Sequence, residues 1–169
     1  MILTKKEILK YIKRGKVKIT PFSESQIGPA SIDLTLGNEF RIFRKSNKKV
    51  NIVEKVDAQS LTKLITVKDY LDLKPGKLVL GITKEKITLP ENIVGWLQGR
   101  SRFARTGLMV HITASFLQPG INNKQVLEIY NASPFTLRLY PNTKICQMIL
   151  SKTKGKEKYK GIFENQINP

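Results

Sequence analysis

The feature that most constrains the fold is a series of short apolar segments with a period of two. In residues 32–36, isoleucine and leucine alternate with aspartate and threonine, which is typical of a half-buried strand. Further segments of this kind lie at 78–80, 87–89, 93–97, 108–113, 126–130, 135–139 and 145–150. Turn residues separate them, at Pro75-Gly76, Pro90, Pro119-Gly120 and Pro141-Asn142. This spacing predicts an all-β barrel or sandwich and not a parallel sheet with crossover helices.

One helix is predicted ahead of the strands, over residues 4–14. Thr4 and Glu7 have the spacing of a capping box, and Gly15 is suited to end the helix. An apolar stripe at helical spacing is formed by Ile8, Leu9, Tyr11 and Ile12. The opposite face carries Lys5, Lys6, Lys10, Lys13 and Arg14. We interpret this basic face as solvated, with an anion-binding surface as the alternative.

The length of 169 residues and the apolar content of 40% fit one compact domain. We predict a single β domain over residues 1–150, with the helix included. Residues 45–72 have no clean period, so we expect an excursion with short strands or a helical turn. Residues 151–169 are rich in lysine and weakly apolar, which predicts either a disordered tail or a lid over the active site.

The charge predicts an anionic partner. Thirty basic residues stand against thirteen acidic ones, giving a net charge of +17. The longest uncharged stretch, residues 106–123, contains several polar residues and does not fit a membrane span, and no secretory signal is visible at the start. The single cysteine, Cys146, excludes a disulfide within the chain. We therefore expect a cytoplasmic protein without a membrane segment.

The supply of metal ligands is also small. His111 and Cys146 are the only residues of their types, whereas a structural zinc site needs about four such ligands and a catalytic one about three. The His/Cys set of zinc-dependent base deaminases cannot be built from them. His111 lies in an apolar run that we predict to be a strand, and we interpret it as structural.

The run from Gly99 to Gly107 is rich in arginine and follows a predicted strand. If Ser101 caps one short helical turn, Ser101 and Arg105 fall on the same face of that turn. Free N–H groups at the start of the turn, with Arg100 and Arg102 beside them, would suit phosphate. The alternative is a basic surface turn with no ligand.

A second candidate is Glu128. In a strand, Leu127 and Ile129 point one way, while Val126, Glu128 and Tyr130 point the other way. One interpretation is a glutamate that faces solvent. The other is a carboxylate in a partly apolar pocket, with a pKa raised toward neutrality, that shuttles protons.

With further segments, these motifs resemble those of the dCTP deaminase family. The matching segments are Pro29 to Asn38, Leu73 to Gly76, Thr88 to Leu97, Gly99 to Ala114 and Gln118 to Asn131. They cover about residues 1 to 150, and the related trimeric dUTPases share the fold and some of the motifs. The resemblance implies a mainly β, dUTPase-like protomer, a distorted β-barrel or jelly roll with a short N-terminal helix. It also implies a homotrimer with active sites at subunit interfaces.

The implied reaction is hydrolytic deamination of dCTP to dUTP and ammonia, with Mg²⁺ accompanying the triphosphate and no zinc. Glu128 matches the family's catalytic glutamate, and Ser101 and Arg105 match the polar pair around the cytosine and the attacking water. Substrate-binding positions correspond to Arg100, Arg102, Ala114, Gln118, Val126, Leu127, Lys158 and Tyr159. Asp33 matches a signature aspartate that is structural or indirectly related to magnesium. No side chain is expected to bind the metal directly.

Some positions depart from the family pattern. Gln118 stands where an aspartate is usual; in dUTPases that aspartate activates water, which an amide cannot do. In deaminases the position meets the deoxyribose. Ser115 replaces a common histidine and Arg102 a common second serine. In the tail, Gln166 is a candidate for the family's glutamine.

Three functions remain open at this point. Deamination of dCTP is favoured by Glu128, and dUTP diphosphatase activity, alone or as a second activity, is disfavoured by Gln118. A non-catalytic nucleic-acid-binding protein is suggested by the charge of +17. Because the basic residues are scattered and no RNA-binding aromatic signature is present, nucleic acid is not the expected partner.

Overall fold

A computed structural model describes residues 1–54 and 56–169. The two α-helices are α1 (Lys5–Lys13) and α2 (Ser101–Ala104), and a 3-10 turn, η1, spans Glu24–Gln26. The strands are β1 (Lys18–Thr20), β2 (Ile32–Thr35), β3 (Glu39–Phe43), β4 (Thr62–Thr66), β5 (Leu71–Leu73), β6 (Leu78–Thr88), β7 (Ile93–Gly99), β8 (Leu108–Met109), β9 (Phe116–Leu117), β10 (Asn122–Asn131), β11 (Leu137–Leu139) and β12 (Lys144–Lys152).

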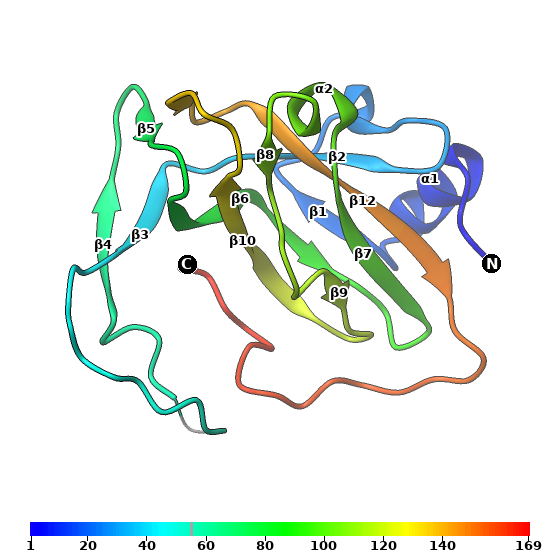
Figure 1. The fold of residues 1–169 in the computed structure, drawn as a ribbon. Coiled ribbons are helices and arrows are strands. Elements are labelled where there is room, and N and C mark those ends of the chain that lie inside the picture. Colours follow the sequence, from blue (N-terminus) through cyan, green and yellow to red (C-terminus); the bar gives the residue numbers. More distant parts are fainter. Residues whose placement is uncertain (55) are drawn as a thin grey trace.

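The strands form three sheets (Figure 1). The largest has the order β4-β3-β6-β10-β8, with β1 also paired to β6; a second has the order β2-β12-β7-β9, and β11 pairs with β5. All the pairings in these sheets are antiparallel. The predicted mainly β fold with a short N-terminal helix is therefore confirmed, although the sheets do not close into a continuous barrel.

The core lies between the two larger sheets. Alternate residues of their strands point into it. Leu34 of β2, Leu127 and Ile129 of β10 and Met148 of β12 are all completely buried. Their neighbours along each strand are partly exposed. Burial of these side chains therefore fixes which face of each strand is left for polar groups.

Several strand predictions need correction. The predicted segment 78–80 and residues 87–88 of the next one belong to a single strand, β6, and Leu89 lies just beyond its end. The strand continues between them because the polar Thr83 and Glu85 are buried and hydrogen-bonded. The predicted strand 108–113 is paired only over Leu108–Met109, and the prediction for 135–139 holds only over Leu137–Leu139. For residues 45–72 we expected either short strands or a helical turn, and the structure has short strands there: β4 and the first two residues of β5. Residue 55 of this segment lies outside the described residues.

Helix α1 ends as predicted but starts differently. Gly15 has a φ of +65°, the left-handed conformation that ends a helix. Thr4 occupies the N-cap position, yet its side chain makes no capping hydrogen bond, so the predicted capping box is wrong. A capping box is instead present at η1, between Ser23 and Gln26. None of the helices in the described part of the chain is long and apolar enough to cross a membrane.

The C-terminal tail runs back across the molecule toward β10 (Figure 1). The Tyr159 N–H donates to the carbonyl of Pro119 at 2.9 Å. Further along, the carbonyls of Glu164 and Gln166 accept from the N–H groups of Asn122 and Lys124, at 3.2 and 2.9 Å. The tail thus follows the first residues of β10 as an additional, irregular edge.

Candidate active site

Glu128 lies in the middle of β10, where the strand passes between β6 and the loop after β8. It pairs with Leu80 of β6, and its neighbours Leu127 and Ile129 are completely buried. The predicted alternation along β10 is therefore confirmed. Because Glu128 is on the opposite face from these core residues, its half-buried side chain reaches the loop of residues 110–114.

The two carboxylate oxygens of Glu128 have different surroundings. Oε2 accepts from the N–H groups of Ile112 at 2.8 Å and Thr113 at 2.6 Å, and at longer range from Ala114 at 3.4 Å. Among the described residues, Oε1 accepts only from the hydroxyl of Thr113, at 3.0 Å, and the same hydroxyl lies 3.3 Å from Oε2. Each carboxylate oxygen has two lone pairs. Oε1 therefore keeps one acceptor position for a water molecule or a substrate proton.

These contacts set the protonation state of Glu128. Burial raises the pKa of its carboxyl group, but the hydrogen bonds from Thr113, Ile112 and Ala114 outweigh burial and lower the pKa below its ordinary value. The sequence-based expectation of a pKa raised toward neutrality is therefore wrong for this arrangement, because the loop donors were not foreseen. At neutral pH Glu128 is an anion, the form that can accept a proton.

His111 lies in the same loop and not in a strand. It is half-buried and lines a cavity of about 290 Å³ with Gly107, Met109 and Ala132. Its Nδ1 atom is buried and has no hydrogen-bond partner among the described residues. Burial lowers the pKa of His111, although the nearby Glu128 charge opposes this effect. The imidazole is therefore neutral at pH 7.

The arginine-rich run forms α2, the predicted short turn, directly after β7. The Arg105 N–H donates to the carbonyl of Ser101 at 3.1 Å, which confirms that these residues lie one turn apart on one face. Arg100, and not Ser101, occupies the N-cap position, so the prediction of Ser101 as the cap is wrong. Ser101, Arg102 and Arg105 are all exposed.

Arg100 differs from Arg102 and Arg105 because its side chain is anchored. Its guanidinium lies 3.3 Å from the carboxylate of Asp33 and donates to the carbonyl of Lys144 at 2.7 Å. The carboxylate of Asp33 is thus paired with Arg100, which fits a role in positioning that side chain. Among the described residues there is no cluster of three or more His, Cys, Asp or Glu side chains that could hold a metal ion.

Glu128 and the arginine turn are not bonded to each other in the part of the chain that the structure describes. Among residues 1–54 and 56–169, no hydrogen bond or ion pair joins Glu128 to Ser101 or Arg105. Glu128 belongs to the sheet of β6 and β10, whereas α2 follows β7 in the other sheet.

The remaining predicted positions lie around the free edge of β10. On the edge away from β6, β10 pairs with β8 at Tyr130 and Asn131. The described hydrogen bonds from β10 to the tail are confined to residues 122–124. Residues 126–128 lie between these two contacts. Since Leu127 is completely buried, only its backbone is available to a ligand; Val126 is partly exposed.

Gln118 and the tail residues lie together at one end of this edge. Gln118 is exposed in the turn between β9 and β10, and Lys158 and Tyr159 pass beside that turn. A side chain added at Gly120 would come within 2.7 Å of Lys158, which shows how closely the tail approaches. Lys158 forms an ion pair with Glu164 at 2.8 Å.

Sequence reasoning missed the residues that hold Glu128. Thr113 contributes both its N–H and its hydroxyl, and Ile112 its N–H. The only available signal was the position of Thr113 within the run 108–113, which the apolar pattern led us to interpret as a strand. Backbone donors carry no sequence signature of their own, so this part of the site had to come from the structure.

Comparison with known proteins supports one family over most of the chain. Residues 2–153 match the family described as dCTP deaminase-like. A protein of Sulfurihydrogenibium sp. named "dCTP deaminase, dUMP-forming" is 34% identical over 98% of this chain and 93% of its own length. One of Alteromonas mediterranea named "dCTP deaminase" is 41% identical over 86% of this chain and 79% of its own.

The fold also has a counterpart among solved structures. The crystal structure of 2'-deoxycytidine 5'-triphosphate deaminase from Agrobacterium tumefaciens superposes with a TM-score of 0.70 and 18% identity. The match covers 88% of this chain and 47% of that one, so this chain spans about half of the larger protein. At this identity the likeness concerns the fold. On the sequence matches, the chain belongs to the dCTP deaminase-like family.

Proposed function

We propose that the protein hydrolyses dCTP to dUTP and ammonia, with Glu128 as the group that moves the protons. The observation that carries the proposal is the Glu128 carboxylate, ionised, fixed by the loop of residues 112–114 and open at Oε1. Relatives named dCTP deaminase, 34–41% identical, support the choice of substrate.

The proposed chemistry needs no metal at the reacting carbon. A water molecule at Oε1 loses a proton to Glu128 as its oxygen bonds to C4 of the cytosine. The carboxyl group then protonates the ring nitrogen. Glu128 next moves the proton of the new C4 hydroxyl to the amino group, so that the carbon–nitrogen bond breaks, the C4 carbonyl forms and ammonia leaves. A positioned acid–base group of this kind contributes about 10²–10⁴-fold.

The other site residues would complete this centre across a subunit interface. We place Ser101 and Arg105 of a neighbouring copy beside the water and cytosine, where the guanidinium offsets charge on Glu128 and on the attacking oxygen. Val126 and Leu127 offer backbone groups to the base, with Ala114 beside them, and Gln118 offers an amide to the sugar. Arg100, Arg102, Lys158 and Tyr159 suit the triphosphate.

Magnesium enters this proposal with the substrate. Mg²⁺ binds the phosphates of a nucleoside triphosphate and needs few protein ligands. Asp33 is already paired with Arg100, so we assign it no direct contact with the ion. With one histidine and one cysteine in the sequence, we expect that a zinc-selective chelator leaves the activity unchanged. The proposed setting is a homotrimer in the cytoplasm.

The direct test uses the purified protein with dCTP and Mg²⁺. Ammonia release is followed while dUTP, dUMP and pyrophosphate are resolved, with Glu128→Gln as the control. Ammonia with intact dUTP supports the proposal. No ammonia from a folded protein would overturn it.

Mixing two inactive variants tests the shared site. Glu128→Gln and Arg105→Ala are each expected to be inactive alone. If they are co-refolded in equal amounts as trimers, about a quarter of the sites combine an intact Glu128 with an intact Arg105 from the neighbour. Recovery of that fraction supports interfacial sites, and no recovery in mixed trimers contradicts them.

A second product, dUMP, is the other candidate. The Sulfurihydrogenibium relative, which this chain matches over 93% of its length, is named as dUMP-forming. Against this, Gln118 lacks the carboxylate that would activate water for attack on the phosphate chain. In the assay above, dUMP and pyrophosphate in step with ammonia would show the second activity.

A further inference from the structure

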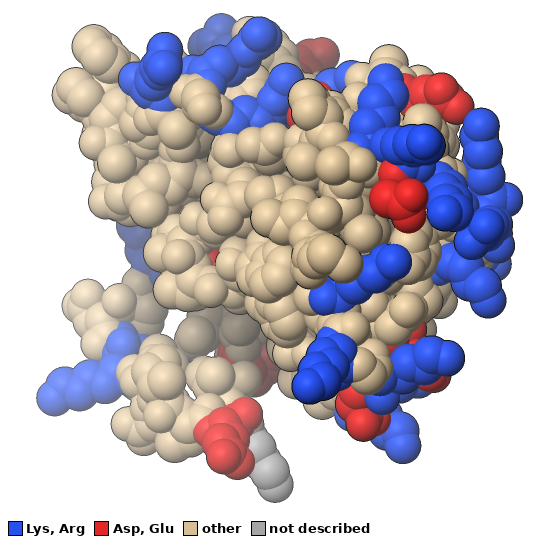
Figure 2. Space-filling model, turned by 90° about the vertical axis from the view of Figure 1, so that its right-hand side faces the viewer, with Lys and Arg blue, Asp and Glu red and all other residues tan. Residues whose placement is uncertain are grey.

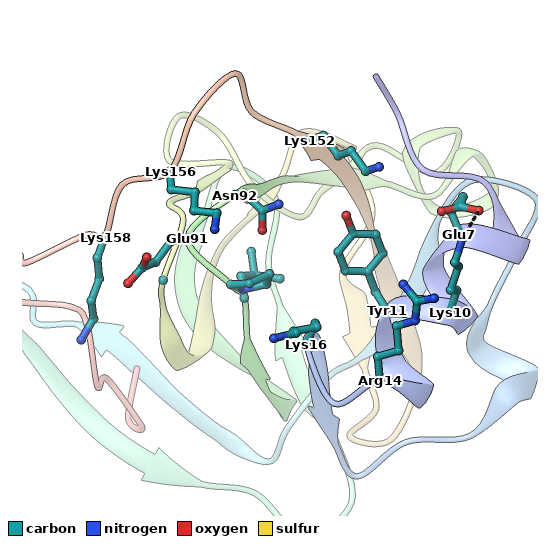
Figure 3. Close-up of a pocket in the computed structure, with 13 residues that line it drawn as sticks. Glu7, Lys10, Tyr11, Arg14, Lys16, Glu91, Asn92, Lys152, Lys156 and Lys158 are labelled. Carbon is teal, nitrogen blue, oxygen red and sulfur yellow. Dashed lines mark ion pairs between the residues drawn. The ribbon is translucent and has the colours of Figure 1, made fainter.

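A second cavity lies away from Glu128, between α1 and the C-terminal tail. Its volume is about 690 Å³, and its walls come from α1 and Lys16, residues 89–92 after β6, Gly120 and the tail from Lys152 to Lys158 (Figure 3). Of the predicted site residues, only Lys158 lines it. Apart from Lys158, the cavity is therefore built from residues that the proposed deamination does not use.

The lining is strongly basic. Six cationic side chains face two carboxylates, Glu7 and Glu91, and the cations are Lys10, Arg14, Lys16, Lys152, Lys156 and Lys158. Glu7 lies 3.7 Å from Lys10, and Lys158 is paired with Glu164 outside the lining. The other four cations form no ion pair with any described residue. On the side of the molecule that carries α1, basic side chains also gather toward one border (Figure 2).

The backbone holds these cations around one space. The Lys16 N–H donates to the carbonyl of Tyr11 at 3.0 Å, which fixes the turn after α1. On the tail side, the N–H groups of Thr153 and Glu157 donate to the carbonyls of Asn92 and Glu91 at 3.1 and 2.9 Å. The Lys152 N–H also donates to the carbonyl of Met1, ahead of α1, at 3.2 Å. Because these bonds keep the tail close to residues 91–92 and to the start of the chain, repulsion between the cations is relieved best by an anion in the cavity.

The other lining groups indicate what kind of anion fits. The Tyr11 hydroxyl and the Asn92 amide are directed into the space between the lysines (Figure 3), and both groups can donate hydrogen bonds to phosphate oxygens. Leu89 and Pro90 add an apolar part. A cavity of this volume is of the size that takes small ligands, whereas single-stranded nucleic acid needs an extended groove with several stacking aromatics.

We propose that this cavity is a second ligand site, which binds a polyphosphate chain, either free or carried by a nucleotide. Arg14, Lys16, Lys152 and Lys156 bind the phosphate oxygens, and Tyr11 and Asn92 complete the hydrogen bonding. This assigns a specific function to part of the basic face of α1, which its sequence alone marked only as solvated or anion-binding. The site stands independently of the proposed deaminase activity.

The test is a calorimetric titration of the full-length protein with sodium tripolyphosphate at low salt. Two equivalents per chain are expected, one at this cavity and one at the triphosphate position near Arg100. The double variant Arg14→Gln/Lys16→Gln should bind tripolyphosphate at the cavity about tenfold more weakly or worse. Binding at the other position and kcat for dCTP should be unchanged. The matched control, Lys6→Gln with Lys13→Gln, removes the same charge from exposed positions of α1 outside the cavity and should bind like the natural protein.

Further outcomes separate the alternatives. ATP that binds the cavity more tightly than tripolyphosphate identifies a nucleotide as the ligand, and equal affinity identifies the free chain. Equal weakening in both double variants would overturn the proposal, because general charge would then explain binding. A single-stranded oligonucleotide that needs Arg14 and Lys16, without tripolyphosphate binding, would also overturn it in favour of nucleic acid. Cavity binding without ammonia release would refute only the deaminase proposal.

Discussion

Two glutamates on neighbouring strands, Glu85 of β6 and Glu128 of β10, receive hydrogen bonds on both oxygens but differ in access. Glu85 is 1% exposed; its oxygens accept from the Gln26 amide at 2.8 Å and the Thr35 N–H at 2.9 Å. Glu128 is half-buried and accepts from an exposed loop. A satisfied carboxylate inside the core is structural, whereas one at an open strand edge is free to react.

The surroundings of Glu85 and Glu128 are also connected through the sheet. Between the pairs Lys124–Lys86 and Val126–Ile82, β10 advances two residues while β6 advances four. Glu85 and Thr83 lie in this bulge, where the Thr83 hydroxyl donates to the Glu85 carbonyl and accepts from the Gln125 N–H. Because a bulge pins the register of its neighbour strand, the Glu85 region holds Glu128 at its place on the edge.

The largest expected effect of any single change is that of Glu128→Gln. An amide cannot take a proton from water, so ammonia release should fall about 10²–10⁴-fold. Its oxygen still accepts from the loop N–H groups, so dCTP affinity and the melting temperature should stay close to those of the natural protein. Turnover within a few-fold of normal would remove Glu128 from the mechanism.

Glu85→Gln should give the opposite result. The amide satisfies only one of the two donors, Gln26 and Thr35, which destabilises the fold by about 1–3 kcal/mol. Urea unfolding measures this loss, with the exposed Glu24→Gln as control. Deamination per folded molecule should be retained. A stable Glu85→Gln protein with lost activity would break the distinction between the two carboxylates.

Asp33→Asn tests the anchoring of Arg100 and should have a smaller effect. Without the ion pair at 3.3 Å, Arg100 is less well placed for a phosphate, so the KM for dCTP should rise about three- to tenfold with kcat within about twofold. Asp72→Asn breaks the exposed pair with Arg138 and serves as the control. A fall in kcat at unchanged KM would assign Asp33 to another role.

The comparison also shows what the sequence could predict. The alternation over residues 126–130 correctly placed Glu128 opposite the core residues Leu127 and Ile129, because strand geometry follows from side-chain period alone. The placement of Ser101 and Arg105 one helical turn apart was also predictable, because it follows from local helix geometry. The dCTP deaminase motifs, interpreted together, led to the correct family.

Features that depend on distant partners could not be predicted. Glu85 interrupts the apolar pattern of β6, so the sequence did not predict that it is buried within one long strand. The partners that satisfy it, Gln26 and Thr35, lie 59 and 50 residues away in the sequence. The pair of Asp33 with Arg100 is equally non-local. The interpretation of Glu128 with a raised pKa, one of two, had the wrong direction because the donors from residues 112–114 are mainly backbone groups, whose placement only the folded loop defines.

The smallest expected effect, and the most specific one, is that of Thr113→Val. The change removes the only described donor to Oε1 of Glu128 but keeps the N–H groups on Oε2. The pKa of Glu128 is lowered in the natural protein, so the acid limb of kcat/KM should lie below the ordinary glutamate value and move to higher pH in the variant. Near pH 7, where Glu128 is ionised in both proteins, kcat/KM should differ by less than about twofold.

The same substitution has a consequence for stability. A carboxylate with a lowered pKa in the folded state stabilises the fold above its unfolded pKa, and this contribution is lost as the pH falls through the folded pKa. Thermal unfolding should therefore depend less on pH below the ordinary glutamate pKa in Thr113→Val than in the natural protein. Thr136→Val, at an exposed threonine before β11, controls for the loss of a hydroxyl. Identical pH profiles of activity and unfolding in both variants would mean that the loop of residues 112–114 does not tune Glu128, and that access alone distinguishes it from Glu85.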